Sequence, residues 1–401
     1  MVTHYEIFVL MRVLMVVPQY PYPIVGGLEK QSHELSKALV AEGIDVQVLS
    51  GKILQDQRDH EIVDGVLVKR IPWSKDKLIR FVRAPFDILF ALWFQRHSFD
   101  VIHLHQHSWV GLYVIIVAKL LGKPILTKLP NVGDLGLPGL RKKLLGWLRQ
   151  RVLLQSDALI AMSAESLTEL MNVGYPTERV LITPNGIALK KISMSLLSEK
   201  KRFDLCKVVF VGRLSEEKQL SALLNAWADV CKDNMHDAML QIWGEGPLEY
   251  KLKQECTNLG ISSRVTFCGH VKGVTNRLLE MDIFVLPSKA EGNSNAILEA
   301  MVAGLPIVST PVGGTPMLVG EDGRPFLCSP GDSEALCSIL LQLIKDRNLR
   351  ISIGMAMRQR VEQYFDICHV AETYIKAYGL LAAKQRSRIC DVGNPVVMEE
   401  K

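Results

Sequence analysis

Paired cysteines are missing from this sequence of 401 residues. All eight cysteines lie after residue 205, and they form no C-x-x-C pair and follow no regular spacing. Disulfide frameworks in secreted domains show such patterns. The cysteines are therefore expected to be reduced, buried thiols in a cytoplasmic protein.

Long apolar runs are missing as well. No run reaches the roughly 18 to 20 residues that a membrane-spanning helix requires. The opening MVTHYEIFVL carries an acidic residue where a signal peptide has basic ones, so export is not expected. The first ten residues are interpreted as an extension or a misassigned start, because MRVLMVV from Met11 has the pattern of a first strand.

The charge balance is modest. The net charge is +5, with the basic excess in the first 200 residues. This charge, together with the lack of a nucleic-acid-binding motif, argues against a nucleic-acid partner. A content of 48% hydrophobic and 22% charged residues is typical of a soluble globular protein, and the length favours two domains.

Short apolar runs alternate with segments of helical period along the chain, which predicts an α/β fold of two doubly wound parallel sheets. Expected helices include residues 109–121, 138–155, 217–230, 247–259 and 295–303. The predicted organisation is a first domain at 11–187, a linker at 188–205, a second domain at 206–365, a helix at 366–383 that crosses back to the first domain, and a tail at 384–401.

The densest motif is PSKAEGNSNAILEAMVAGLPIVSTPVGG, which begins at Pro287. It predicts a strand end, a loop of small residues, and a helix that starts near Ser294, a good N-cap residue. Exposed N–H groups at a helix start suit an anion. Asn295 and Glu299 are four residues apart and share one helix face, where a carboxylate can accept hydrogen bonds from a ribose.

This run resembles the family 4 glycosyltransferases, whose second-domain signature pairs two glutamates as E-x7-E, here Glu291 and Glu299. The resemblance implies the GT-B fold, two facing Rossmann-like domains with a cleft between them, and retaining transfer from a nucleotide-sugar without metal or cofactor. It assigns the ribose to Glu299 and the donor sugar to Glu291. The sugar and phosphate would contact the backbone of Gly292, Asn293, Ser294 and Asn295. The alternative is a solvated loop residue at Glu291 and a surface helix carboxylate at Glu299.

A second motif, FVGRLSEEK from Phe210, places Arg213 and Lys218 at a strand-to-helix turn. Two fixed cations there can neutralise a diphosphate and stabilise the charge that develops as it leaves. The resemblance assigns them this role. Alternatively they form a solvated face, with Glu216 and Glu217 pairing with Lys218.

In the first domain, the resemblance makes Gly26 and Gly27 a turn where backbone can approach the donor phosphate. The run DVIHLHQHS places His103, His105 and His107 on one side of a strand and its exit. Zinc is disfavoured there, because Asp100 is the only carboxylate nearby and no cysteine joins the histidines. His105 is expected to line the cleft and His103 to be a core residue.

One position departs from the family pattern. After the strand PILTK the family has a histidine that contacts the donor, and Leu129 stands at the aligned position. Either Lys128 or Asp134 replaces it, or the alignment slips by one position. Asn185, in the family's P-N-G, is expected near the hinge and the donor.

Two segments concern the acceptor. KRIPWSKDKLIRFVRAPFDILFALWF and RKKLLGWLRQRVLL interleave basic with large apolar residues. They predict peripheral association with an anionic membrane on its cytoplasmic face, or, alternatively, ordinary surface helices packed by their apolar sides. The sequence thus predicts a retaining glycosyltransferase acting on a lipid-linked acceptor or another glycan precursor. The alternative function is a catalytically weak GT-B subunit that binds nucleotide or glycan and supports a partner enzyme.

Overall fold

The computed structural model describes residues 11–21, 26–73, 76–106, 108–129, 131–133, 136–189, 205–232 and 237–393. The first ten residues, His107, Asp134, most of the predicted linker at 188–205 and the end of the predicted tail lie outside these ranges. The chain divides into two compact units. Unit 1 comprises Met1–Met162, Ser166–Thr183 and Ile367–Lys401, and unit 2 comprises Ser163–Glu165 and Pro184–Asp366.

Unit 1 is built on a sheet in the order β3-β4-β2-β1-β5-β6-β7-β8, parallel except for the β3–β4 pair. Since β2 and β5 flank β1 on opposite sides, the strand order reverses at β1 and β5, which makes a topological switch point. The strands are β1 (Arg12–Val17), β2 (Asp45–Lys52), β3 (His60–Val63), β4 (Val66–Pro72), β5 (Val101–Leu104), β6 (Ile125–Lys128), β7 (Ala158–Ala161) and β8 (Val180–Ile182).

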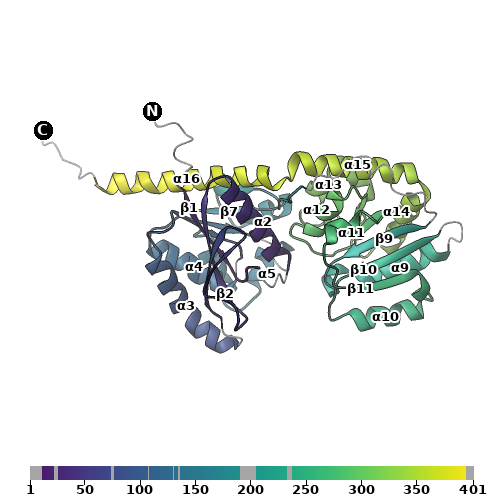
Figure 1. The fold of residues 1–401 in the computed structure, drawn as a ribbon, viewed down its shortest axis with the longest axis horizontal. Coiled ribbons are helices and arrows are strands. Elements are labelled where there is room, and N and C mark those ends of the chain that lie inside the picture. Colours follow the sequence, from purple (N-terminus) through teal and green to yellow (C-terminus); the bar gives the residue numbers. More distant parts are fainter. Residues whose placement is uncertain are drawn as a thin grey trace. The chain divides into compact units, whose positions relative to one another are not determined.

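Helices cover both faces of this sheet. On one face α2 (Gly27–Ala41) packs beside α16 (Ile367–Gly393) (Figure 1). Both helices contribute to one apolar cluster. The other face carries a second cluster. Its helices are α3 (Lys77–Phe94), α4 (Trp109–Leu120), α5 (Leu137–Arg141), α6 (Gly146–Leu153) and α7 (Ala164–Asn172), with the 3₁₀ turn η2 (Thr177–Arg179) before β8.

Unit 2 has a parallel sheet in the order β11-β10-β9-β12-β13, so its switch point lies between β9 and β12. The strands are β9 (Cys206–Val211), β10 (Ala238–Trp243), β11 (Val265–Gly269), β12 (Ile283–Leu286) and β13 (Ile307–Ser309). The helices are α9 (Leu220–Lys232), α10 (Glu249–Asn258), α11 (Val274–Leu278), α12 (Asn295–Val302), α13 (Thr315–Gly323), α14 (Ser333–Lys345) and α15 (Arg347–Tyr364), with η3 (Glu216–Lys218), η4 (Ser262–Arg264) and η5 (Arg324–Phe326).

The predicted α/β class with parallel sheets is confirmed, and several details differ. The helix expected at 138–155 is broken into α5 and α6 at Leu145, which has φ 53°. Gly146 permits the tight turn, because a Cβ there would lie 2.4 Å from the carbonyl oxygen of Leu140. The last helix, α16, continues to Gly393, beyond its expected end at 383. Cys268 and Cys368 are exposed, so not every described thiol is buried as expected.

Candidate functional site

The two strongest motifs meet at one edge of the unit 2 sheet. β9 leads into the loop that carries Arg213 and Lys218, and β12 leads into the loop that carries Glu291. Because β9 and β12 are parallel neighbours, both loops leave the same edge. This edge is the switch point, where open parallel sheets bind ligands.

An ion pair joins the two loops directly. Lys218 Nζ lies 2.5 Å from Glu291 Oε1, and the side chains are only 18% and 11% exposed. Ser288 donates a hydrogen bond of 2.6 Å to the same carboxylate oxygen. Glu291 is therefore held in place and is not a freely solvated loop residue. The alternative in which Glu216 and Glu217 take Lys218 is disfavoured, since Glu217 accepts a 2.7 Å hydrogen bond from Ser215.

Arg213 lies in the same loop as Lys218, between β9 and η3. Its side chain is exposed, whereas the neighbouring Leu214 is buried in the unit 2 core. The loop therefore anchors itself through Leu214 and leaves the guanidinium available at the surface of the edge. An exposed guanidinium can donate several hydrogen bonds to a phosphate.

The loop before α12 is buried although its residues are polar. Asn293 and Ser294 are 9% and 7% exposed, and Glu299 within α12 is 5% exposed. The surface-carboxylate alternative for Glu299 is therefore wrong. Ser294 occupies the N-cap position as expected, but its side chain makes no capping hydrogen bond.

Asn185 ties this loop to the start of unit 2. Its amide nitrogen donates to the carbonyl oxygen of Asn293 at 3.0 Å and to Oδ1 of Asn295 at 2.8 Å. Its backbone N–H donates to Oδ1 of Asn293 at 3.1 Å. These three hydrogen bonds fix the segment that the resemblance assigns to the sugar and phosphate.

Two glycines complete the loop, and the sequence reasoning gave them no role. The N–H of Gly314 donates to the carbonyl oxygen of Gly292 at 2.7 Å. Gly313 has φ 55°, and a Cβ there would lie 1.9 Å from the carbonyl oxygen of Glu291. Only glycine fits this approach. The signal was the adjacent pair in PVGG, directly after β13.

In unit 1, Gly26 and Gly27 lie at the start of α2. Gly26 has an extended backbone, with φ −164°, that any residue can adopt. A Cβ there would lie 2.9 Å from Oε2 of Glu29, the tip of a flexible side chain. Neither fact tests the phosphate role, which stays a prediction.

His103 and His105 lie beneath the surface of unit 1 and stack on each other, with ring centroids 4.0 Å apart. Both are at most 1% exposed, so His103 is a core residue as expected, and His105, which was expected to line the cleft, is buried as well. Nδ1 of His103 lies 2.7 Å from the hydroxyl of Tyr378 on α16. Burial lowers the pKa of both imidazoles well below 6.5. Within the described ranges, no cluster of three or more His, Cys, Asp or Glu is arranged to hold a metal ion.

The position of the expected family histidine is part of the core. Leu129 is 3% exposed and packs in the cluster under α4 to α7. Lys128, at the end of β6, is 4% exposed, and burial lowers its pKa to about 7. Lys128 therefore has an unusually low pKa for a lysine and lies near the carboxyl ends of the strands. Asp134 lies outside the described ranges.

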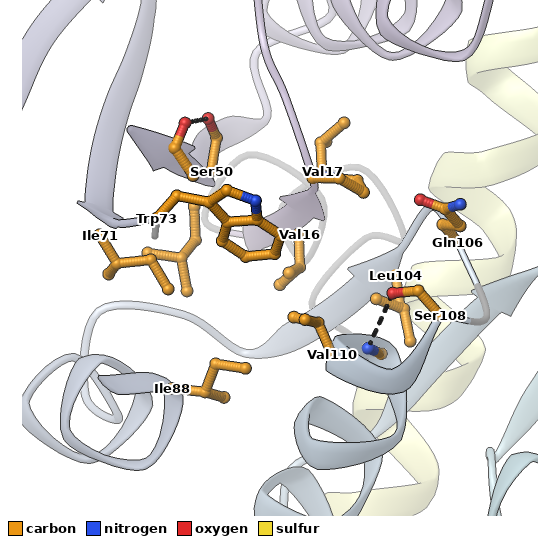
Figure 2. Close-up of a pocket in the computed structure, with 14 residues that line it drawn as sticks. Val16, Val17, Ser50, Ile71, Trp73, Ile88, Leu104, Gln106, Ser108 and Val110 are labelled. Carbon is orange, nitrogen blue, oxygen red and sulfur yellow. Dashed lines mark hydrogen bonds between the residues drawn. The ribbon is translucent and has the colours of Figure 1, made fainter. Parts of the chain in front are cut away.

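A pocket opens at the carboxyl ends of β1, β2 and β5, at the switch point of unit 1. Figure 2 shows Val16, Trp73, Ile88 and Val110 around it, with Gln106 and Ser108 on one side. Its volume of about 20 Å³ is enough for about one water molecule. As it stands, the pocket is too small for a sugar.

Two family models match consecutive parts of the sequence. The model described as Glycosyltransferase Family 4 matches residues 25–191, and the one described as Glycosyl transferases group 1 matches residues 206–346. N-acetyl-alpha-D-glucosaminyl L-malate synthase of Bacillus anthracis is 24% identical, over 89% of this chain and 94% of that protein. UDP-Gal:alpha-D-GlcNAc-diphosphoundecaprenol alpha-1,3-galactosyltransferase of Escherichia coli is 26% identical, over 86% and 91%.

Solved structures agree on the fold. HepE of Anabaena, in complex with UDP and glucose, is 20% identical and superposes with a TM-score of 0.74 over 91% of this chain and 98% of that one. Sucrose-phosphate synthase of Thermosynechococcus elongatus is 18% identical, with a TM-score of 0.76 over 93% and 100%. With both family matches, two parallel-sheet units and the paired motifs at the β9–β12 edge, the chain belongs to the family 4 glycosyltransferases of the GT-B fold.

Proposed function

We propose that this glycosyltransferase moves a sugar from a nucleoside diphosphate sugar to a hydroxyl group of a lipid-linked or other cell-envelope glycan precursor, with retention of anomeric configuration and without a metal ion. The contact between Lys218 and Glu291 carries the proposal, because it brings the cation assigned to the phosphates and the carboxylate assigned to the sugar together at the switch point of unit 2. The names of the relatives support the substrate classes, since one uses UDP-galactose and a diphosphoundecaprenol acceptor.

The roles follow from the charges. Arg213 and Lys218 would hold the diphosphate and stabilise the negative charge that it gains as the bond to the anomeric carbon breaks. Two fixed cations can supply the stabilisation that a metal ion gives elsewhere. Glu299, buried on α12, would accept hydrogen bonds from the ribose hydroxyls, and Glu291 from the hydroxyls of the sugar.

The proposed transfer balances without a protein nucleophile. The acceptor oxygen bonds to the anomeric carbon, the carbon–oxygen bond to the diphosphate breaks, and the hydroxyl proton passes to a phosphate oxygen of the leaving group. Attack from the face that the diphosphate leaves gives retention. The protein contributes positioning and electrostatic stabilisation.

Donor turnover tests this function. Release of nucleoside diphosphate is measured over a panel of donor sugars with a crude lipid acceptor, with and without EDTA. We expect turnover with at least one donor in both conditions, and a decrease in kcat of about 10²- to 10³-fold for Arg213→Ala or Lys218→Ala. The matched controls are Arg324→Ala and Lys253→Ala, which remove surface cations of unit 2 that pair with Glu321 and Glu249.

Three results would count against the proposal. Unchanged turnover in Arg213→Ala and Lys218→Ala would contradict the assignment of these two residues to the phosphates. Loss of turnover with EDTA, restored by a divalent cation, would overturn metal independence. Inertness towards the whole panel would favour the weak GT-B subunit, for which the buried Leu129 in place of a donor-binding histidine is the motivating observation.

A further inference from the structure

Helix α3 of unit 1 has apolar side chains on two opposite sides. Ala84, Ile88 and Leu92 are at most 5% exposed and pack on the sheet. The outer side is also apolar, although it faces away from the core. We define the outer apolar face as Ile79, Val82, Phe86, Phe90, Trp93 and Phe94, which are between 48% and 77% exposed.

This exposure is unusual for a surface helix, which normally carries charged residues opposite its buried stripe. Among the described side chains of α3, the charged ones are Arg83 and Asp87, which pair at 3.9 Å. Phe90 and Phe94 stack on each other with centroids 6.2 Å apart. Single exposed apolar residues are common, but a contiguous row of large ones marks an interaction surface.

Neighbouring helices extend the same chemistry. α3 packs on α4, and α4 packs on α6. Ile116 and Leu120 of α4 are 43% and 75% exposed. The segment at 141–151, which we name the basic segment, combines exposed cations with exposed apolar residues. Its exposed members are Arg141, Lys142, Lys143, Leu144, Leu145, Trp147, Leu148 and Arg151.

The charged residues of the basic segment all have one sign. Residues 135–156 include no aspartate or glutamate, so the cations of the basic segment have no acidic neighbour in sequence. Beside α3, Arg96 lies over the ring of Trp93 at 4.6 Å, with the guanidinium at the margin of the apolar face. Aromatic rings flanked by long cationic side chains are the composition of a helix that lies in the headgroup region of an anionic bilayer.

We propose that the outer apolar face of α3 and the basic segment form a docking surface for an anionic lipid bilayer. The phenylalanines and Trp93 enter the headgroup region, and the cations of the basic segment bind lipid phosphates. The association is peripheral, since none of the described helices is long and apolar enough to cross a membrane. A protein partner would need carboxylates at positions that match these cations. An anionic bilayer offers phosphates across its whole surface, so it can bind the cations wherever they lie.

Vesicle cosedimentation tests the docking surface without donor or acceptor, so its outcome is independent of the proposed transfer. The full chain is centrifuged with vesicles of phosphatidylcholine alone and of phosphatidylcholine mixed with an equal amount of phosphatidylglycerol. We expect binding to the mixed vesicles that weakens at high salt. Each cation near the surface contributes about fivefold to binding. Arg141→Gln/Lys142→Gln/Lys143→Gln should therefore weaken binding by on the order of tenfold or more.

The apolar face is tested by Phe86→Gln/Phe90→Gln/Phe94→Gln, which should weaken binding by about tenfold or more at any salt concentration. The matched control for the aromatic residues is Met171→Gln/Tyr250→Gln/Met355→Gln, because these three are exposed but isolated from one another. The control for the cations is Lys232→Gln/Lys251→Gln/Lys345→Gln, three exposed lysines of unit 2. Melting temperatures verify that each variant is folded.

The proposal is overturned if the wild-type chain stays in the supernatant with the mixed vesicles, or if the two test variants bind as the wild type does. It is also overturned if light scattering shows a dimer that the phenylalanine variant converts to a monomer, since that result assigns the face to a second copy of the chain.

Discussion

Lys128 sits at the end of β6 with only 4% of its surface exposed, which is rare for a lysine. Burial lowers its pKa from 10.5 to about 7. Between these two values the unfolded chain binds a proton at this side chain that the folded protein does not bind. The free energy of unfolding should therefore rise with pH in this window, by up to about 1.4 kcal/mol per pH unit from this group.

Urea unfolding of the wild type and of Lys128→Met, between about pH 7 and pH 8.5, checks this slope. The buried Cys206 thiol, whose pKa burial raises from 9.0 to about 12, opposes this slope only weakly in this range, and it does so equally in the wild type and in Lys128→Met. Lys128→Met should flatten the slope, and the exposed Lys251→Met should leave it unchanged. Equal slopes in all three proteins would show that Lys128 is not the cause.

The sequence identified members of the candidate site, but it predicted neither the ion pair between Lys218 and Glu291 nor the burial around them. Glu291, Lys218 and Arg213 were chosen from motif spacing, and the structure brings Lys218 and Glu291 into contact across two loops. The burial of Glu299 and the equal burial of the two histidines were not predictable, because burial depends on which segments cover a side chain. For His103 the cover is Tyr378, which lies 275 positions further along the chain.

At the scale of elements, α16 completes unit 1. Val370, Ala371, Tyr374 and Tyr378 of this helix are at most 4% exposed and belong to the same cluster as α2 and β1. The helix therefore contributes core residues to unit 1. It also makes a buried polar contact between the hydroxyl of Tyr378 and Nδ1 of His103.

Tyr378→Phe should destabilise the protein by about 1 to 3 kcal/mol, because it leaves Nδ1 of the buried His103 without its partner. Chemical denaturation measures the change. Tyr364→Phe is the control, since Tyr364 is 53% exposed. A loss of stability as large in the control as in Tyr378→Phe would refute the assignment of the effect to the buried hydrogen bond.

Elements with a strong period were predicted well, and breaks within them were not. β1 was expected at RVLMVV and spans Arg12–Val17. The helix expected at 138–155 breaks because Leu145 adopts a left-handed conformation that leucine rarely takes. Tertiary packing decides that turn, since Gly146 lies against the carbonyl oxygens of Leu140 and Arg141, and local sequence preference does not show it.

At the scale of the whole molecule, a ligand that binds only the folded state must stabilise it. With the free nucleotide at one hundred times its Kd, the gain is about 2.7 kcal/mol. We expect at least one of UDP, GDP and ADP to raise the melting temperature of the wild type, and Arg213→Ala to reduce the rise at equal concentration. Lys253→Ala should respond as the wild type does. No rise with any of the three nucleotides would contradict a nucleotide site.

Unit 1 is formed by segments that lie far apart in the sequence, and this affects how the chain folds during synthesis. Its sheet and most of its helices precede Pro184, but α16 begins at Ile367, after the whole of unit 2. On the ribosome, unit 2 can fold as soon as it emerges. The earlier segments of unit 1 cannot complete their core at that stage, because the apolar side that α16 covers is still exposed to solvent. We therefore expect unit 1 to complete its folding after unit 2, the reverse of the usual order in which the N-terminal domain finishes first. Until α16 is translated, the apolar side of unit 1 that it covers stays exposed, and exposed apolar surface of this kind favours binding by chaperones.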